Sequence, residues 1–183
     1  MTYDFSGFKK RAKEIGEHLS KELSSIHTGR ASVALLDGIM IESYGSRIAI
    51  PHVATISTED ARTLRIVPWD KANNKEVEKA INAASLGISV SVDDAGIRVF
   101  FPELTTERRI AFTKVVRNKE EDARVAVKGE REKVKNDIVD KEREGIINED
   151  DKVRALEELQ KLVNETNDMI EALGDKKERE IMG

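Results

Sequence analysis

The sequence contains no cysteine, which excludes disulfide bonds and zinc sites built from thiolates. It also lacks any apolar run of about 18 residues, the length that a membrane-spanning helix needs. The first residues, MTYDFSGFKKRAKEIGEH, do not contain the apolar core of a signal peptide. These absences predict a soluble, cytoplasmic protein that does not associate with membranes.

Aromatic residues are scarce, at 4% of the chain, whereas charged residues reach 36% and hydrophobic residues 39%. This balance is typical of long amphipathic helices, which bury one aliphatic side and keep charges on the others. A length of 183 residues allows one domain or two small ones. The net charge of −4 argues against a protein that coats nucleic acid unspecifically, but it is compatible with a local basic face.

Three segments have apolar residues spaced by three and four, which predicts amphipathic helices. The first covers residues 3–28, and Gly29 follows it as a candidate C-terminal cap because glycine adopts the left-handed conformation at low cost. The second follows Thr105, a candidate N-cap, and ends near Glu144. The third follows Asn148, a second candidate N-cap, and continues toward the C-terminus.

The region between the first two helices has a different pattern, with short runs of β-branched residues and all three prolines of the chain. The prolines are expected to end strands, because proline cannot donate a ladder hydrogen bond. The patterns predict a short helix at 32–36, a hairpin turning at Tyr44-Gly45-Ser46, strands at 53–57 and 63–67, a helix at 74–84, and a hairpin of 88–92 with 97–101.

The three long helices are expected to pack as an antiparallel bundle, because each has one apolar face to bury. The fold class is therefore α+β: a discontinuous three-helix bundle, residues 1–29 and 104–183, with a small α/β domain inserted at 30–103. Two chain crossings join these domains. The candidate hinge residues are Gly29 and Arg30 in the first crossing and Glu103 and Leu104 in the second.

Motifs of catalysis are missing: there is no GxxxxGK[ST] phosphate loop, no HExxH and no GxSxG. The histidines, at 18, 27 and 52, do not have a metal-ligand spacing. The run Glu120-Glu121-Asp122 is interpreted as a solvated face and not as a catalytic pair. Trp69, the only tryptophan, is interpreted as a half-buried anchor and not as a binding platform. We expect no catalytic residue, no metal site and no cofactor.

Two stripes run along the second predicted helix. The apolar stripe contains Phe112, Val116, Ala123, Val127, Val134 and Ile138. The basic stripe lies roughly a quarter turn away and contains Arg117, Arg124, Lys128, Arg131 and Lys135. Two interpretations are open. Acidic residues near the stripe, among them Glu121 and Glu132, favour an ordinary solvated face, whereas the shared direction of the cations favours contact with an RNA backbone.

Motifs along nearly the whole chain resemble those of ribosome recycling factors. The signature of that family, [IL]RTGRA followed by LLDGI, is similar to HTGRAS at 27–32 and LLDG at 35–38. Further similar segments are YG at 44–45, STEDARTL at 57–64, VEKAI at 77–81, SLG at 85–87, IRV at 97–99, LTTERR at 104–109, ARVAV at 123–127, NEDD at 148–151 and KKERE at 176–180.

The resemblance implies a near-L-shaped, tRNA-like molecule that binds the bacterial ribosome after termination. With elongation factor G and GTP, members of the family help to separate the subunits, so that mRNA and deacylated tRNA leave. The bundle contacts ribosomal RNA, mainly of the large subunit, and the inserted domain swings about the crossings. The family has no catalytic residues, and its partner uses the GTP. A monomer is expected because the bundle closes its own core.

Carried over by position, the RNA-facing residues implied by the resemblance are Arg30, Arg124 and Arg131, with Lys128 in place of a usual arginine. His27 also replaces an arginine, and Glu132 removes a cation. Lysine cannot make the planar bidentate phosphate contact of arginine, and neutral histidine adds little charge. Weaker electrostatic binding than in a typical member is expected. The second hypothesis is a helical adaptor that binds a protein, and an enzyme is the third.

Overall fold

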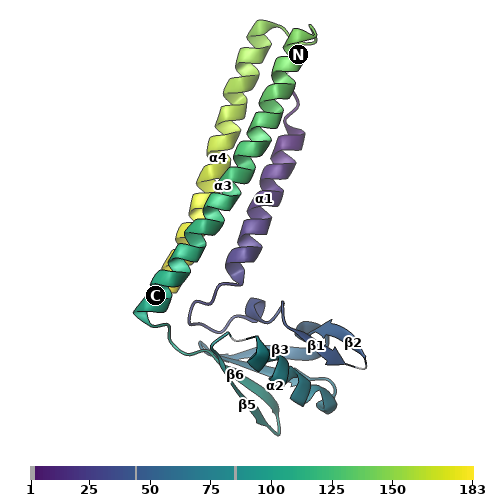
Figure 1. The fold of residues 1–183 in the computed structure, drawn as a ribbon, viewed down its shortest axis with the longest axis vertical. Helices are drawn as coiled ribbons and strands as arrows, with labels where there is room; N and C mark the ends of the chain where they lie inside the picture. Colours follow the sequence, from purple (N-terminus) through teal and green to yellow (C-terminus); the bar gives the residue numbers. More distant parts are fainter. Residues whose placement is uncertain (1–2, 44, 85) are drawn as a thin grey trace. The chain divides into compact units, whose positions relative to one another are not determined.

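The computed structural model describes residues 3–43, 45–84 and 86–183. It confirms the α+β fold class, with a helical bundle and a small domain of strands (Figure 1). The chain divides into two compact units. The first runs from the N-terminal residues to Leu23 and continues over Thr113–Ile181, and the second is Ser24–Phe112.

Three long helices make up the bundle: α1 (Ser6–Ser24), α3 (Thr106–Arg143) and α4 (Glu149–Met182). α1 and α4 run in the direction opposite to α3 (Figure 1). Each helix buries one stripe against the others, and this burial stabilises a helix more than its intrinsic propensity does. The apolar stripe of α3 is confirmed as a core face, since Val116, Ala123, Val127 and Ile138 are buried. None of the helices in the described ranges has the length and apolar composition to cross a membrane.

The ends of the long helices are set by caps that the sequence predicts. Thr105 Oγ1 accepts a hydrogen bond from the backbone N–H of Arg108 at 3.3 Å, which caps α3. Asn148 Oδ1 accepts one from the N–H of Asp151 at 2.7 Å, which caps α4. Gly145, with φ of 75°, lies just beyond the end of α3. The two predicted N-caps are confirmed.

The predicted end of the first helix is wrong. α1 stops at Ser24, so Gly29 is not its cap, although Gly29 has the positive φ of 80° that favours glycine. Serine is a weak helix former because its hydroxyl competes for backbone groups. Tertiary packing also favours a non-helical conformation after Ser24, because the His27 ring is buried. Its centroid lies 5.5 Å from that of Phe101 and 6.4 Å from that of Phe112.

In its described residues, the second unit contains two antiparallel sheets, the helix α2 (Asn74–Ala83) and the first turns of α3. The larger sheet has the order β3-β4-β6-β5, and the smaller is the hairpin β1-β2. The strands are β1 (Met40–Ser43), β2 (Ser46–Ala49), β3 (Ala54–Asp60), β4 (Thr63–Pro68), β5 (Ser89–Asp93) and β6 (Gly96–Phe100). Short 3₁₀ helices are η1 (Val33–Leu35), η2 (Ile50–His52) and η3 (Lys71–Asn73). The predicted hairpins, strands and helix are confirmed, except that Tyr44, and Ser85 of the SLG motif, lie outside the described residues.

One face of the four-stranded sheet forms the core of this unit. Side chains alternate between the two faces of a strand, so every second residue points to the core. Those at Leu64, Ile66, Ile97 and Val99 have no exposed area, and they pack in one cluster with Val77 and Ile81 of α2. Phe101, just after β6, is also fully buried in this cluster. Each such side chain contributes about 1.5–3 kcal/mol through burial.

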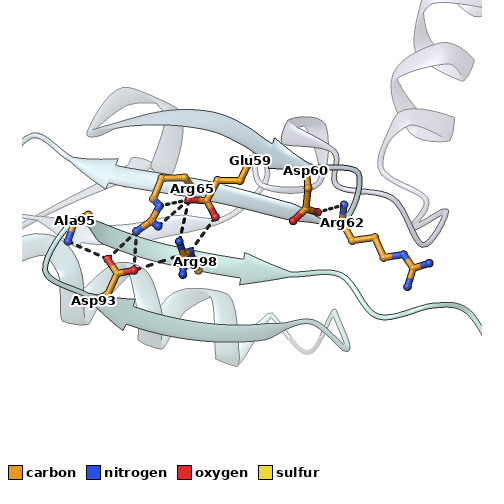
Figure 2. Close-up of polar contacts among 7 residues, drawn as sticks. All are labelled: Glu59, Asp60, Arg62, Arg65, Asp93, Ala95 and Arg98. Atoms are coloured by element: carbon orange, nitrogen blue, oxygen red, sulfur yellow. Dashed lines mark hydrogen bonds and ion pairs between the residues drawn. The ribbon is translucent and has the colours of Figure 1, made fainter.

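The open face of the same sheet carries an ion-pair network to which each strand contributes one residue (Figure 2). Arg65 Nε donates to Glu59 Oε1 at 2.8 Å, and Arg65 Nη1 donates to Asp93 Oδ1 at 2.7 Å. Arg98 Nε donates to Glu59 Oε2 at 2.9 Å. The Arg65 side chain is only 12% exposed, so water screens its ion pairs less than it screens pairs of fully exposed side chains. The network ties β3, β4, β6 and β5 together across the face.

This network is expected to make the small domain sensitive to acid. Arg65, and then Arg98, holds the pKa of Glu59 below its ordinary 4.5, and Arg65 holds the pKa of Asp93 below 3.8. A lowered folded-state pKa stabilises the fold above the ordinary carboxyl pKa, and this stability is lost as pH falls through the lowered value. Arg65→Met should therefore reduce the free energy of unfolding more at pH 7 than at pH 3, measured by urea titration.

The control is Arg47→Met, which removes an exposed arginine of β2 outside the network. It should change the unfolding free energy little at either pH. Equal losses for Arg65→Met at both pH values would contradict the assignment of the acid sensitivity to this network.

The interpretation of Trp69 as a half-buried anchor is wrong. Its side chain is 71% exposed, and its indole N–H donates to Thr55 Oγ1 at 3.1 Å. β4 ends at Pro68, whose side chain is buried. The next side chain points to the opposite, open face, because directions alternate along a strand.

Candidate nucleic-acid interface

The basic stripe lies on the flank of α3 that borders α4. Arg117, near the start of the stripe, reaches α4 through a hydrogen bond from its Nε to Glu178 Oε1 at 2.8 Å. The opposite flank of α3 borders α1, since Lys119 Nζ donates to Glu22 Oε1 at 2.7 Å. A continuous helix over 38 residues places all five cations of the stripe on one side of the bundle. Several phosphates of one backbone can meet such a surface at once.

Carboxylates of the chain neutralise much of the stripe. Besides the Arg117–Glu178 pair, Arg124 lies 3.6 Å from Glu120 and 4.0 Å from Glu121. The remaining pairs are Arg131 with Glu132 at 2.6 Å and Lys135 with Glu132 at 3.7 Å.

Lys128 is the exception. Among the residues that the structure describes, no carboxylate oxygen lies within 4.0 Å of its ammonium group, and the side chain is exposed. Lys128 is therefore the cation of the stripe whose charge no carboxylate of the described residues neutralises.

The interpretation of Glu120 as part of a solvated face is wrong, since this residue is only 8% exposed. Its carboxylate lies over Gly174 of α4, where an added Cβ would come within 1.2 Å of Glu120 Oε1. Burial raises the pKa of Glu120 and Arg124 opposes the rise, while the nearby carboxylates Glu178, Asp175 and Glu171 add to it. The spacing contains a signal for this burial, since Glu120 continues the helical series of Val116, Ala123 and Val127.

Arg30 and the other candidate hinge residues belong to the second unit. Arg30 is exposed and follows Gly29 in the first crossing. The second crossing runs beside it: a Cβ built on Gly29 would lie 3.6 Å from Leu104 Cγ. Leu104 is buried, and its carbonyl accepts a hydrogen bond from Arg109 Nε at 3.4 Å. Glu103 is exposed and pairs with Arg62.

An apolar hollow of about 580 Å³ lies on another side of the bundle, between α1 and α4. Its lining includes Phe8, Ala12, Met169 and Leu173, and no member of the basic stripe. Within the described ranges, no group of three or more histidine, aspartate or glutamate residues is placed to hold a metal ion. The chemistry that this arrangement can perform is binding of a polyanion by exposed cations.

The sequence is similar to known proteins over nearly its whole length. The sequence model described as "Ribosome recycling factor" matches residues 19–182. The ribosome-recycling factor of Thioalkalivibrio sulfidiphilus is 42% identical over 174 residues, which cover 95% of this chain and 94% of the relative. That of Zymomonas mobilis is 38% identical over 181 residues, which cover 99% and 98%.

Solved structures show the same likeness. A solution structure of a ribosome recycling factor matches with a TM-score of 0.74 and 39% identity, covering 95% of this chain and 92% of that one. A second match is a chain from models of the T. thermophilus ribosome recycling factor and E. coli elongation factor G bound to the E. coli post-termination complex. Its TM-score is 0.67 at 32% identity, with 98% and 97% covered.

Proposed function

The chain belongs to the ribosome recycling factor family, and from this premise we propose that it binds the bacterial ribosome after termination. Acting with elongation factor G and GTP, it promotes separation of the subunits and release of mRNA and deacylated tRNA. A related chain occurs in models with elongation factor G on a post-termination complex, which supports both partners. The nucleotide is used by the partner, and this chain works as a monomer in the cytoplasm without catalytic residues or a cofactor.

The observation that carries this proposal is the set of cations on one flank of α3. Ribosomal RNA, mainly of the large subunit, is the partner that fits them, because phosphates attract several cations on one rigid surface. The proposed contacts are Lys128 and Arg131 at the centre, Arg117, Arg124 and Lys135 around them, and Arg30 on the other unit. Binding is weaker than in a typical member, since Lys128 replaces an arginine and Glu132 pairs with Arg131.

We propose further that the two domains, residues 1–29 with 104–183 and residues 30–103, move relative to each other about the crossings. Gly29 and Arg30, with Glu103 and Leu104, form the hinge. Large backbone changes in such motions are absorbed by a few residues in loops or at the ends of elements. Gly29 suits this role, because glycine passes between positive and negative φ at low cost.

Removal of a cation from the stripe tests the RNA contact. Lys128→Ala and Arg131→Ala should each reduce the slope of log affinity against log salt by about 0.7–0.9, the contribution of one phosphate contact. The measurement is co-sedimentation with purified 70S ribosomes over a salt series. The matched control is Lys13→Ala, which removes an exposed lysine of α1 beside the groove with α4. If the control and the stripe variants change the slope equally, net charge and not the stripe governs binding.

The recycling activity is tested by subunit splitting with elongation factor G and GTP, followed by light scattering. Splitting should require this protein and should fall in Arg131→Ala. If Arg131→Ala folds normally and leaves both ribosome binding and splitting unchanged, the proposed role of the stripe is wrong.

A further inference from the structure

Two cations of the basic stripe are paired with carboxylates that are largely buried in the bundle. Arg117 is 70% exposed, but its Nε bonds Glu178 of α4, which is only 25% exposed. Arg124 is paired with the buried Glu120 of its own helix. Both partners are held in place by the packing between α3 and α4, since Glu120 lies over Gly174 and Glu178 follows one helical turn after it.

A carboxylate and an RNA phosphate make the same demand on an arginine. Both are anions that accept hydrogen bonds from the planar guanidinium fork. Glu178 occupies the Nε of Arg117, so a phosphate cannot use the side of the fork that contains this atom. A phosphate at the other side of the fork would lie close to the Glu178 charge, and like charges at such distances repel.

We infer that Glu178 and Glu120 are built-in competitors of RNA phosphate for Arg117 and Arg124. Lys128, without a competing carboxylate in the described structure, makes the first contact, and each arginine engages only when a phosphate displaces its carboxylate. This inference rests on the proposed function and specifies how the RNA surface of α3 is regulated. The factor then binds RNA more weakly than the same cations would without their carboxylates, and weaker binding favours release after each round.

The exchange has a signature in the salt dependence. A phosphate that binds a cation releases counterions from the RNA, and this release sets the slope of log affinity against log salt. A displaced carboxylate attracts a cation from solution, and this uptake cancels part of the counterion release. Removing the competitor should therefore make the slope steeper as well as the binding tighter.

The test is Glu178→Gln in the full chain, which keeps the size of the side chain and removes its charge. Co-sedimentation with 70S ribosomes should show tighter binding at low salt. The slope should be steeper by up to about 0.7–0.9, which is roughly a threefold larger loss of affinity between about 50 and 200 mM salt. The matched control is Glu165→Gln, on α4 and exposed, which lies beside the groove with α1 and not beside the stripe. Its slope should equal that of the unsubstituted protein.

A double-variant cycle separates competition from net charge. In the Arg117→Ala background, Glu178→Gln should give no steeper slope, because the cation that it would release is missing. Equal effects of Glu178→Gln and Glu165→Gln overturn the inference, as does weaker binding by Glu178→Gln, which would mean that Glu178 positions Arg117 for RNA. The proposed function fails separately, and the inference with it, if the unsubstituted protein binds ribosomes without salt dependence or if Lys128→Ala has no effect.

Discussion

Phe101→Ala is expected to lower the free energy of unfolding of the small domain by about 3–5 kcal/mol, the cost of removing a fully buried phenylalanine. Phe101 has no exposed area and joins the core of the second unit. Its backbone N–H also donates to the carbonyl of Arg62 at 2.8 Å, and its ring lies beside that of His27. The substitution would leave a cavity where the last strand passes into the second crossing, so it should also loosen the proposed hinge.

The neighbouring residue provides the control for this prediction. Phe100 is the last residue of β6 and points to the open face, where it is 44% exposed. Phe100→Ala should therefore cost less than about 1 kcal/mol. Urea unfolding followed by the fluorescence of Trp69, the only tryptophan, reports on this unit. Similar losses for the two variants would mean that the core does not depend on Phe101 in the way its burial indicates.

The second large effect is expected from locking the hinge. A disulfide between Gly29→Cys and Leu104→Cys should leave ribosome binding largely intact and slow subunit splitting by an order of magnitude or more, because the two crossings of the proposed hinge would be tied together and could no longer move independently. The two crossings are in van der Waals contact at this point, since a Cβ at Gly29 would lie 3.6 Å from Leu104 Cγ and 3.6 Å from the Leu104 backbone nitrogen. This proximity makes the pair a candidate for a disulfide, which needs Cβ atoms about 3.5–4.5 Å apart. The chain has no other cysteine that could pair wrongly.

The same protein in its reduced form is the matched control, because it contains both substitutions but no lock. Binding is measured by co-sedimentation and splitting by light scattering with elongation factor G and GTP. Mass spectrometry after thiol alkylation verifies the lock. Splitting at the same rate in the oxidised and reduced forms would disprove the hinge at these crossings.

The secondary structure was predictable where a local rule decides it. The caps at Thr105 and Asn148 are formed by their own side chains, and the alternation in the second hairpin sets which residues face the core. The errors have another origin. α1 ends early because His27 packs against Phe101, which is distant in the sequence, and Trp69 is exposed because β4 brings Pro68 to the core side.

The candidate site also has features that the local sequence predicts and features that depend on tertiary packing. The direction of the five cations follows from the 3.6-residue period of a single helix, so the sequence alone was sufficient to place them on one flank. Acids on the same helix, such as Glu121 and Glu132, were also identifiable as neighbours by their spacing. Glu178 was not, because it lies 61 residues from Arg117 and meets it only through the packing of α4 on α3.

What the sequence determined by itself is therefore the set of elements, the stripes on each helix and, through its motifs, the family to which the chain belongs. These properties depend on the period of a helix or strand and on residues close together in the chain. What only the tertiary structure decided is the environment of the charges: Lys128 faces solvent without a partner carboxylate in the described structure, Arg117 is held by Glu178, and Glu120 is buried over Gly174. Such pairings depend on how two helices pack, and the sequence of one helix does not specify which side chain of the other helix it will contact.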